Sequence, residues 1–185
     1  MLCLALIVAV VAASYSWLGR IYAVPSGSMR PALEPGDRIV VSRLDRTEVR
    51  RGDVVVVDVG STWAAAAVPS PRMVVKRVIG LPGERVTCCD AAGRLSIDGV
   101  VLDEPYAAYD PSGPPFDVVV PAGRVWLMGD ARADSTDSRH HLGSPGGGSV
   151  PVGAVQGRVV AVAWPPSRVS GVRHGSSTGD RSTAR

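Results

Sequence analysis

The sequence is short of lysine and of cysteine, and its positive and negative charges nearly cancel. Of 185 residues, 20 are lysine or arginine and 17 are acidic, which gives a formal net charge of +3. No basic helix with interleaved aromatic residues accompanies this thin surplus, which argues against nucleic acid as a partner. With 45% hydrophobic residues the chain is too apolar to be disordered, and its length predicts one compact domain.

Lys76 is the only lysine, so all the other strongly basic side chains are arginines. Because arginine stays protonated in proteins, a proton-accepting amine could only be Lys76 or the N-terminus. Lys76 lies in the aliphatic segment MVVKRVI, where lost solvation would lower the pKa of its amine. A pKa near 10.4 leaves about one lysine in 2,500 neutral at pH 7, and a depression of roughly two to three units leaves several per cent or more. Taken alone, Lys76 also fits a snorkelling side chain at a strand edge, and alternation along a strand places Arg77 on the opposite face.

Three cysteines are too few for a disulfide framework. Cys3 lies in an apolar run, whereas Cys88 and Cys89 are adjacent and could form a strained vicinal disulfide, bind a metal or be two ordinary strand residues. We favour the strand residues, because a zinc site needs four ligands at spacings such as CxxC. The neighbouring His140 and His141 suit a loop, so we expect no metal site.

The N-terminus is an apolar run, almost wholly aliphatic from residue 2 to 13 and uncharged as far as Arg20. This length is about what a helix needs to cross a bilayer, and Tyr15 and Trp17 are placed like interfacial anchors. A cleaved signal peptide is the alternative, but a basic n-region is absent. We therefore predict a transmembrane anchor over residues 1–19. No lysine or arginine precedes the run, so charge does not determine its orientation.

The rest of the chain consists of short β-rich runs separated by glycine, proline and aspartate, with no long amphipathic helix. The pattern predicts a mainly β domain over residues 20–166. Its expected strands are 38–42, 53–59, 73–79, 94–97, 117–120, 125–128 and 155–164. The glycine-rich residues 143–149 read as a flexible loop, and residues 167–185 as a disordered tail with too little apolar surface to fold.

Directly after the apolar run, two serines stand between prolines and a glycine in the segment PSGSMRP. Proline and glycine fix an unusual backbone path, which can present a hydroxyl at a defined angle. The same composition also suits a turn-rich linker that leaves the membrane.

Several separate segments of the chain resemble the bacterial type I signal peptidases, which are membrane-bound Ser/Lys proteases that remove signal peptides. The resemblance covers about residues 1–166 and implies an antiparallel β domain after one transmembrane helix. It rests on the segments PSGSMRPAL, GDRIVV, RGDVVVV, KRVIGLPGERV, GDARADSTDSR and VPVGAVQGRVVAVAWP, which occur in the family's order and approximate spacing.

This resemblance implies a role for each matching residue. Ser28 matches the nucleophile and Lys76 the general base, a pair that needs no metal or organic cofactor. Ser26 matches the serine that joins the Ser28 N–H in the oxyanion hole, and Ser135 the serine that orients the lysine. Three residues of the segment GDARADSTDSR match residues that hold its loop beside the lysine, namely Asp130, Asp137 and Arg139. This segment reads GDARADS where the family's commonest form is GDNRDNS, so Ala131 and Ala133 replace groups that normally hydrogen-bond within the loop and put its rigidity in doubt.

The resemblance also implies substrate pockets that accept small residues, usually alanine, at the first and third positions before the cut. The expected lining of the first pocket is Val24, Met29, Leu33 and Val75, with Tyr22, Ile39 and Val75 near the other. The extended residues 22–26 would pair with the substrate as an added strand. Residues 63–68 form a second apolar segment, which fits either a surface on the lipid or a core strand.

We therefore expect a monomeric, single-pass serine endopeptidase of the cell membrane, with its catalytic domain on the extracytoplasmic side. Its expected partners are signal-peptide-bearing preproteins, cut after Ala-X-Ala-like sequences, and membrane lipid. The alternatives are a maturation protease of the same Ser/Lys clan with few substrates, and an inactive membrane-tethered binding module.

Overall fold

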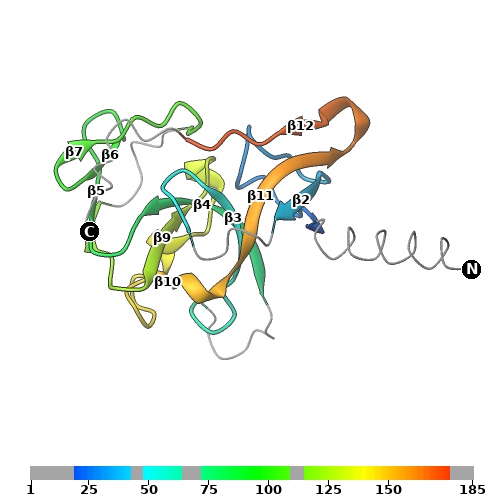
Figure 1. The fold of residues 1–185 in the computed structure, drawn as a ribbon. Coiled ribbons are helices and arrows are strands. Elements are labelled where there is room, and N and C mark those ends of the chain that lie inside the picture. The colour runs from blue at the N-terminus through cyan, green and yellow to red at the C-terminus, as the bar shows by residue number, and fades with distance from the viewer. Residues whose placement is uncertain (1–18, 43–47, 64–71, 109–114, 176–185) are drawn as a thin grey trace, which may run out of the picture.

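The structure is a computed structural model that describes residues 19–42, 48–63, 72–108 and 115–175 (Figure 1). The predicted membrane anchor therefore lies, except for Gly19, outside the described residues. Within the described ranges, no helix has the length and apolar character needed to cross a membrane.

Two antiparallel sheets form the domain. The larger sheet has the strand order β1-β2-β11-β3-β4-β9-β10, and β12 adds to β11. Its strands are β1 (Arg20–Ala23), β2 (Arg38–Ser42), β3 (Val54–Asp58), β4 (Met73–Gly80), β9 (Arg124–Met128), β10 (Val150–Pro151), β11 (Val155–Trp164) and β12 (Ser170–Gly171). The smaller sheet has the order β7-β6-β5-β8 and lies at the opposite end of the molecule from β2 (Figure 1). Its strands are β5 (Arg85–Cys88), β6 (Leu95–Ile97), β7 (Val100–Val101) and β8 (Phe116–Val119).

The described helices are four short 3₁₀ turns in the second half of the chain. They are η1 (Arg132–Asp134), η2 (Ser138–His141), η3 (Val152–Ala154) and η4 (Pro166–Arg168). The first two follow β9 and shape the loop 129–141. The mainly β, antiparallel character predicted from the sequence is confirmed.

The run of valines in β3 is explained by burial of both faces of the larger sheet. Val54 and Val56 belong to one core cluster, together with Met29 and Leu33, and Val55 and Val57 belong to a second cluster on the other face. A third cluster, which includes Phe116 and Trp126, fills the space beside the smaller sheet. Because β3 is covered on both sides, its sequence shows no alternation of polar and apolar residues.

The predicted strands 38–42 and 155–164 match β2 and β11, and the other five lie within one residue of an observed strand at each end. Five strands were not predicted, namely β1, β5, β7, β10 and β12. All five have at most four residues, and all but β5 pair with a longer neighbour.

The expectation of a disordered tail from residue 167 is wrong for residues 167–175. Here β12 pairs with β11, and Arg168 forms an ion pair of 2.9 Å with the buried Asp37. Further along, the Arg173 carbonyl accepts a hydrogen bond from Arg77, and the Gly175 N–H donates to the Gly52 carbonyl. The segment is held by backbone pairing and ion pairs, which its low apolar content could not reveal. Residues 176–185 lie outside the described residues.

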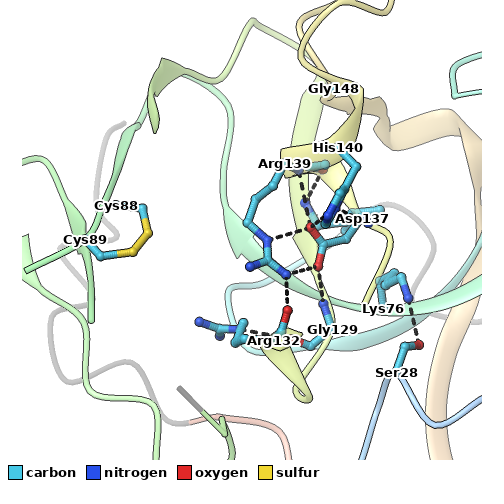
Figure 2. Close-up of polar contacts among 12 residues, drawn as sticks. Ser28, Lys76, Cys88, Cys89, Gly129, Arg132, Asp137, Arg139, His140 and Gly148 are labelled. Atoms are coloured by element: carbon cyan, nitrogen blue, oxygen red, sulfur yellow. Dashed lines mark hydrogen bonds and ion pairs between the residues drawn. A yellow bond between two sulfur atoms is a disulfide. The ribbon is translucent and has the colours of Figure 1, made fainter. Parts of the chain in front are cut away.

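Two further sequence interpretations change. Cys88 ends β5 and forms a disulfide with Cys89, so the favoured interpretation as two ordinary strand residues is wrong (Figure 2). Trp63 is the only residue of the apolar segment 63–68 among the described residues. It is buried, stacks on His141 and donates its indole N–H to the Gly148 carbonyl, which is core packing rather than a lipid-facing position.

Arg168 is expected to stabilise the domain in a pH-dependent way. Burial raises the pKa of Asp37, but hydrogen bonds from Arg168 and from the Glu34 N–H outweigh it, so the pKa lies below its usual value. Arg168→Gln should lower the free energy of unfolding by about 1 to 2 kcal/mol at pH 7. A carboxyl with a lowered folded pKa contributes stability above its unfolded pKa and loses it as the pH falls through the folded value. The deficit of the variant should therefore shrink in acid.

Urea unfolding of the full chain in detergent, between pH 3 and 7, measures this effect. Arg85→Gln is the matched control, because Arg85 pairs with Asp117 on the surface, where solvent screening leaves an ion pair little effect on stability. An equal loss in both variants, or a loss for Arg168→Gln that is independent of pH, would contradict the prediction.

Candidate active site

Ser28 lies in the loop between β1 and β2, and the loop is fixed at both ends. The Val24 N–H donates to the Asp37 carbonyl, and the Gly36 N–H donates to the Val24 carbonyl. Met29, directly after Ser28, is fully buried in the first core cluster. Ser28 itself is 6% exposed, so its hydroxyl is held at the edge of the core rather than on a free linker.

Lys76 reaches Ser28 from β4, which lies between β3 and β9 in the larger sheet. It is 4% exposed, and its Nζ donates a hydrogen bond of 2.7 Å to the Ser28 Oγ (Figure 2). The sheet thus brings together two residues that are 48 positions apart in the sequence. The alternative of a lysine that snorkels into solvent is wrong.

The environment of Lys76 lowers the pKa of its amine to about 8. Burial is the largest cause, because it disfavours the charged form. The carboxylates of Asp137, Asp130 and Asp134 oppose this shift, whereas the Arg139 guanidinium adds to it. At a pKa of about 8, roughly one tenth of the amine is neutral at pH 7.

Arg77, the next residue of β4, occupies the other face of the strand, as alternation predicted. It is fully buried and forms an ion pair of 2.6 Å with Asp130. Its guanidinium lies 3.8 Å from the centre of the Tyr106 ring. Asp130, predicted as a support, is thus bound to the strand that carries Lys76.

The loop 129–139 packs directly against the backbone of Ser28. The Ala131 N–H donates to the Ser28 carbonyl at 3.1 Å. A side chain at Gly129 would collide with this same carbonyl and with Ser135, so the close approach requires glycine at position 129. The loop therefore fixes the backbone of Ser28 relative to β9 and β4.

Asp137 and Arg139 hold this loop in shape (Figure 2). The Asp137 carboxylate is completely buried, accepts a hydrogen bond from the Gly129 N–H at 3.1 Å and pairs with Arg139 at 2.9 Å. Burial raises the pKa of Asp137, but the Arg139 hydrogen bonds and charge outweigh it and keep the pKa below its usual value. Arg139 also donates to the Arg132 carbonyl, which connects the two 3₁₀ turns of the loop.

Glu104 is a structural residue that the sequence analysis missed. It is fully buried and accepts hydrogen bonds from Arg132 at 2.6 and 3.2 Å and from the Tyr106 hydroxyl at 3.1 Å. Arg132 in turn donates to the Gly129 carbonyl. Ala131 and Ala133 put the rigidity of the loop in doubt. The ion pair between Arg132 in the loop and Glu104 in another segment holds the loop in place. Nothing in the sequence around Glu104 marks it as the partner of a residue 28 positions away.

The two remaining serines differ in their surroundings. Ser26 is exposed, and its Oγ lies 3.4 Å from the Ser28 Oγ. Within the described residues the Ser28 N–H makes no hydrogen bond and can donate to a ligand, whereas the Ser26 hydroxyl shares a hydrogen bond with the Ser28 Oγ. Ser135 is buried, but its Oγ forms no hydrogen bond within the described ranges, and the predicted bond to Lys76 is absent.

A cavity of about 130 Å³ lies beside the Ser28–Lys76 pair. Its lining consists of Tyr22, Ala23, Val24, Pro25, Ser26, Ser28, Met29, Val56, Met73, Val74, Val75 and Lys76. Four of the six predicted pocket residues are among them. Leu33 and Ile39 are not, because both are fully buried in the core beneath the loop. The unpredicted lining residues come mainly from the start of β4.

Comparison with known proteins identifies the family. A family model described as signal peptidase, peptidase S26, matches residues 1–164. The chain belongs to this signal peptidase family. It is therefore a serine endopeptidase of the kind that removes signal peptides.

Relatives of this signal peptidase include longer bacterial enzymes, of which the match covers about 70%. A signal peptidase I from Mycobacterium tuberculosis (strain ATCC 25618 / H37Rv) is 35% identical over 204 residues, covering 85% of this chain and 69% of its own. A probable signal peptidase I from Mycobacterium leprae is 32% identical over 210 residues, covering 85% and 72%. A crystal structure of a signal peptidase I from Enterococcus faecalis V583 has a TM-score of 0.46 and 26% identity, and the match covers 60% of this signal peptidase and 97% of that chain.

Removing the Glu104 charge is expected to destabilise this signal peptidase strongly. Glu104→Gln leaves the buried Arg132 without its counter-ion and should lower the free energy of unfolding by about 2 to 4 kcal/mol. Glu34→Gln is the matched control, because Glu34 pairs with Arg30 on the surface and should contribute about 1 kcal/mol at most. Chemical denaturation in detergent measures both variants. Equal losses would show that Glu104 does not anchor the loop.

Proposed function

We propose that the signal peptidase cuts preproteins with Ser28 as the nucleophile and neutral Lys76 as the general base. The observation that carries this proposal is the 2.7 Å hydrogen bond between the Lys76 Nζ and the Ser28 Oγ, made by two buried side chains. A serine hydroxyl becomes an effective nucleophile when a neighbouring base accepts its proton, and a neutral amine at this distance can do so.

The reaction proceeds in two halves. The Ser28 Oγ attacks the carbonyl carbon of the scissile bond while its proton passes to Lys76. The oxyanion that forms accepts hydrogen bonds from the Ser28 N–H and the Ser26 hydroxyl, and one such donor contributes about 3 to 4 kcal/mol in other serine proteases. Lys76 then gives the proton to the departing amine, which leaves an acyl-enzyme. In the second half Lys76 accepts a proton from water while the water oxygen attacks the acyl carbon. Lys76 then gives this proton to the Ser28 Oγ as the ester bond breaks, which releases the signal peptide and restores both residues.

The dimensions of the cavity favour small residues before the cut. Its volume is about 130 Å³, and Met29, Val56 and Val75 are among its lining residues, so we place the small side chains at the first and third positions there. The β1 strand ends the strand order of the larger sheet, so its outer edge is open to an extended peptide. A bound preprotein would pair there as an added strand and direct alternate side chains into the cavity.

The place of action follows from the apolar segment that precedes the domain. A transmembrane anchor over residues 1–19 would hold the catalytic domain against the extracytoplasmic surface of the cell membrane. Two large apolar side chains, Ile21 on β1 and Trp164 at the end of β11, are more than half exposed and would contact lipid. In this arrangement a monomer meets preproteins as they emerge from the bilayer.

Loss of either member of the pair is expected to abolish cleavage. Ser28→Ala removes the nucleophile, and Lys76→Arg keeps the positive charge but cannot accept a proton, so each should lower kcat/KM by about a thousandfold or more. Ser144→Ala, in the loop after η2, is the control and should retain parental activity. Cleavage of a preprotein with an Ala-X-Ala site, followed by gel electrophoresis, measures all three.

Parental activity in both variants would refute the proposed pair, whereas a parental protein that cleaves no preprotein would favour an inactive binding module. Incubation with several unrelated preproteins separates the remaining alternatives. Cleavage of most of them supports a general signal peptidase, whereas cleavage of one or two supports a maturation protease with few substrates.

The pH profile reports the base directly. Because Lys76 must be neutral to act and its pKa is lowered to about 8, kcat/KM should rise tenfold per pH unit below this value and level off above it. Initial rates with a fluorogenic peptide between pH 6 and 9.5 measure the profile, and circular dichroism checks that the fold is intact throughout. A profile that is flat, or that rises only above pH 10, would exclude a buried neutral lysine as the base.

A further inference from the structure

Asp134 is an exposed carboxylate at the end of η1, close to the Ser28–Lys76 pair. Within the described residues it has no ion-pair partner, in contrast to the buried Asp130 and Asp137. A methyl group placed on the Cα of Gly27 would lie 3.1 Å from the Asp134 Oδ2. The charge of Asp134 also acts on the amine of Lys76 and raises its pKa. Asp134 therefore lies next to Gly27, the residue that precedes Ser28.

Asp134 is not among the residues that line the cavity. The cavity is lined by the loop after β1, by β3 and by the start of β4, and it includes no residue of the loop 129–139. Gly27, which Asp134 approaches, is also absent from the lining. If the cavity holds residues before the cut, then the residues after the cut pass along the side of Gly27 and Asp134.

A second charged group also lies close to Gly27. The guanidinium of Arg30 would lie 3.3 Å from a methyl group there. However, Arg30 is bound at 2.6 Å by Glu34, which compensates its charge. Of these two charges beside Gly27, Asp134 is the one without an ion-pair partner in the described part of the chain.

We propose that Asp134 determines specificity for the first residues after the scissile bond, favouring basic residues and disfavouring acidic ones. This inference rests on the proposed function, because it takes its direction from the position of the peptide at Ser28. Two unit charges several ångströms apart at a protein surface interact strongly enough to change a rate by about threefold to tenfold. The effect is screened by salt, since the Debye length is about 8 Å at physiological ionic strength.

Three matched preproteins test the proposal with the full-length protein in detergent. They differ only in carrying lysine, glutamine or glutamate at the second position after the cut. The parental protein should cleave the lysine substrate about tenfold faster in kcat/KM than the glutamate substrate. Asp134→Asn, which keeps the size of the side chain, should reduce this ratio to about one, and Asp134→Lys should invert it. In about 0.5 M salt the parental ratio should shrink toward one.

Asp103→Asn is the control, because Asp103 is an exposed acid after β7 and its loss changes the net charge equally. The control should leave the ratio at its parental value. The role of Asp134 would be overturned if Asp134→Asn and Asp134→Lys left the ratio unchanged, or if the control changed it as much. In either case, cleavage of the substrates would still uphold the proposed function. A parental protein that cleaves none of the three substrates would overturn the proposed function, and this inference with it.

Discussion

The hydrogen bond between the Lys76 amine and the Ser28 hydroxyl is the constraint on which the rest of the structure depends. It requires an amine removed from water, and lowering its pKa from 10.5 to about 8 costs the folded state about 3 kcal/mol near neutral pH. This is a large share of the stability of an ordinary domain, which is about 5 to 15 kcal/mol. The valine-rich strands around β4, covered on both faces, are where this cost is offset, because they bury apolar surface on both sides of the lysine.

The loop 129–139 must support this pair without undoing the desolvation of the lysine. A buried carboxylate beside an amine raises its pKa, and Asp137 does so for Lys76. Arg139 forms an ion pair with Asp137 and acts on Lys76 in the opposite direction. The same ion pair fixes the loop and places two opposite charges near the amine, whose effects on the pKa of Lys76 oppose each other.

The sequence predicted those features that arise from local pattern. Valine runs predicted β3 and β4. The serines between prolines indicated a loop that holds the Ser28 hydroxyl at a defined angle. The missed features depend on partners that are distant in the sequence. Glu104 has no local pattern of its own, because its role depends on Arg132, and β12 exists because β11 offers it an edge. Leu33 and Ile39 were expected at the pocket from the family resemblance, and the sequence alone does not distinguish apolar residues that line a cavity from those that lie beneath it.

The arrangement of the site explains why arginines, rather than further lysines, surround Lys76. Three buried cations surround the site, namely Arg77, Arg132 and Arg139, and each pairs with a buried carboxylate. Arginine stays protonated across the pH range of proteins, whereas a buried lysine titrates readily. A change of pH that neutralises Lys76 therefore leaves these three ion pairs intact. Because the supports are arginines and the base is the single lysine, the site can change its protonation state at one atom without loosening the structure that holds this atom in place.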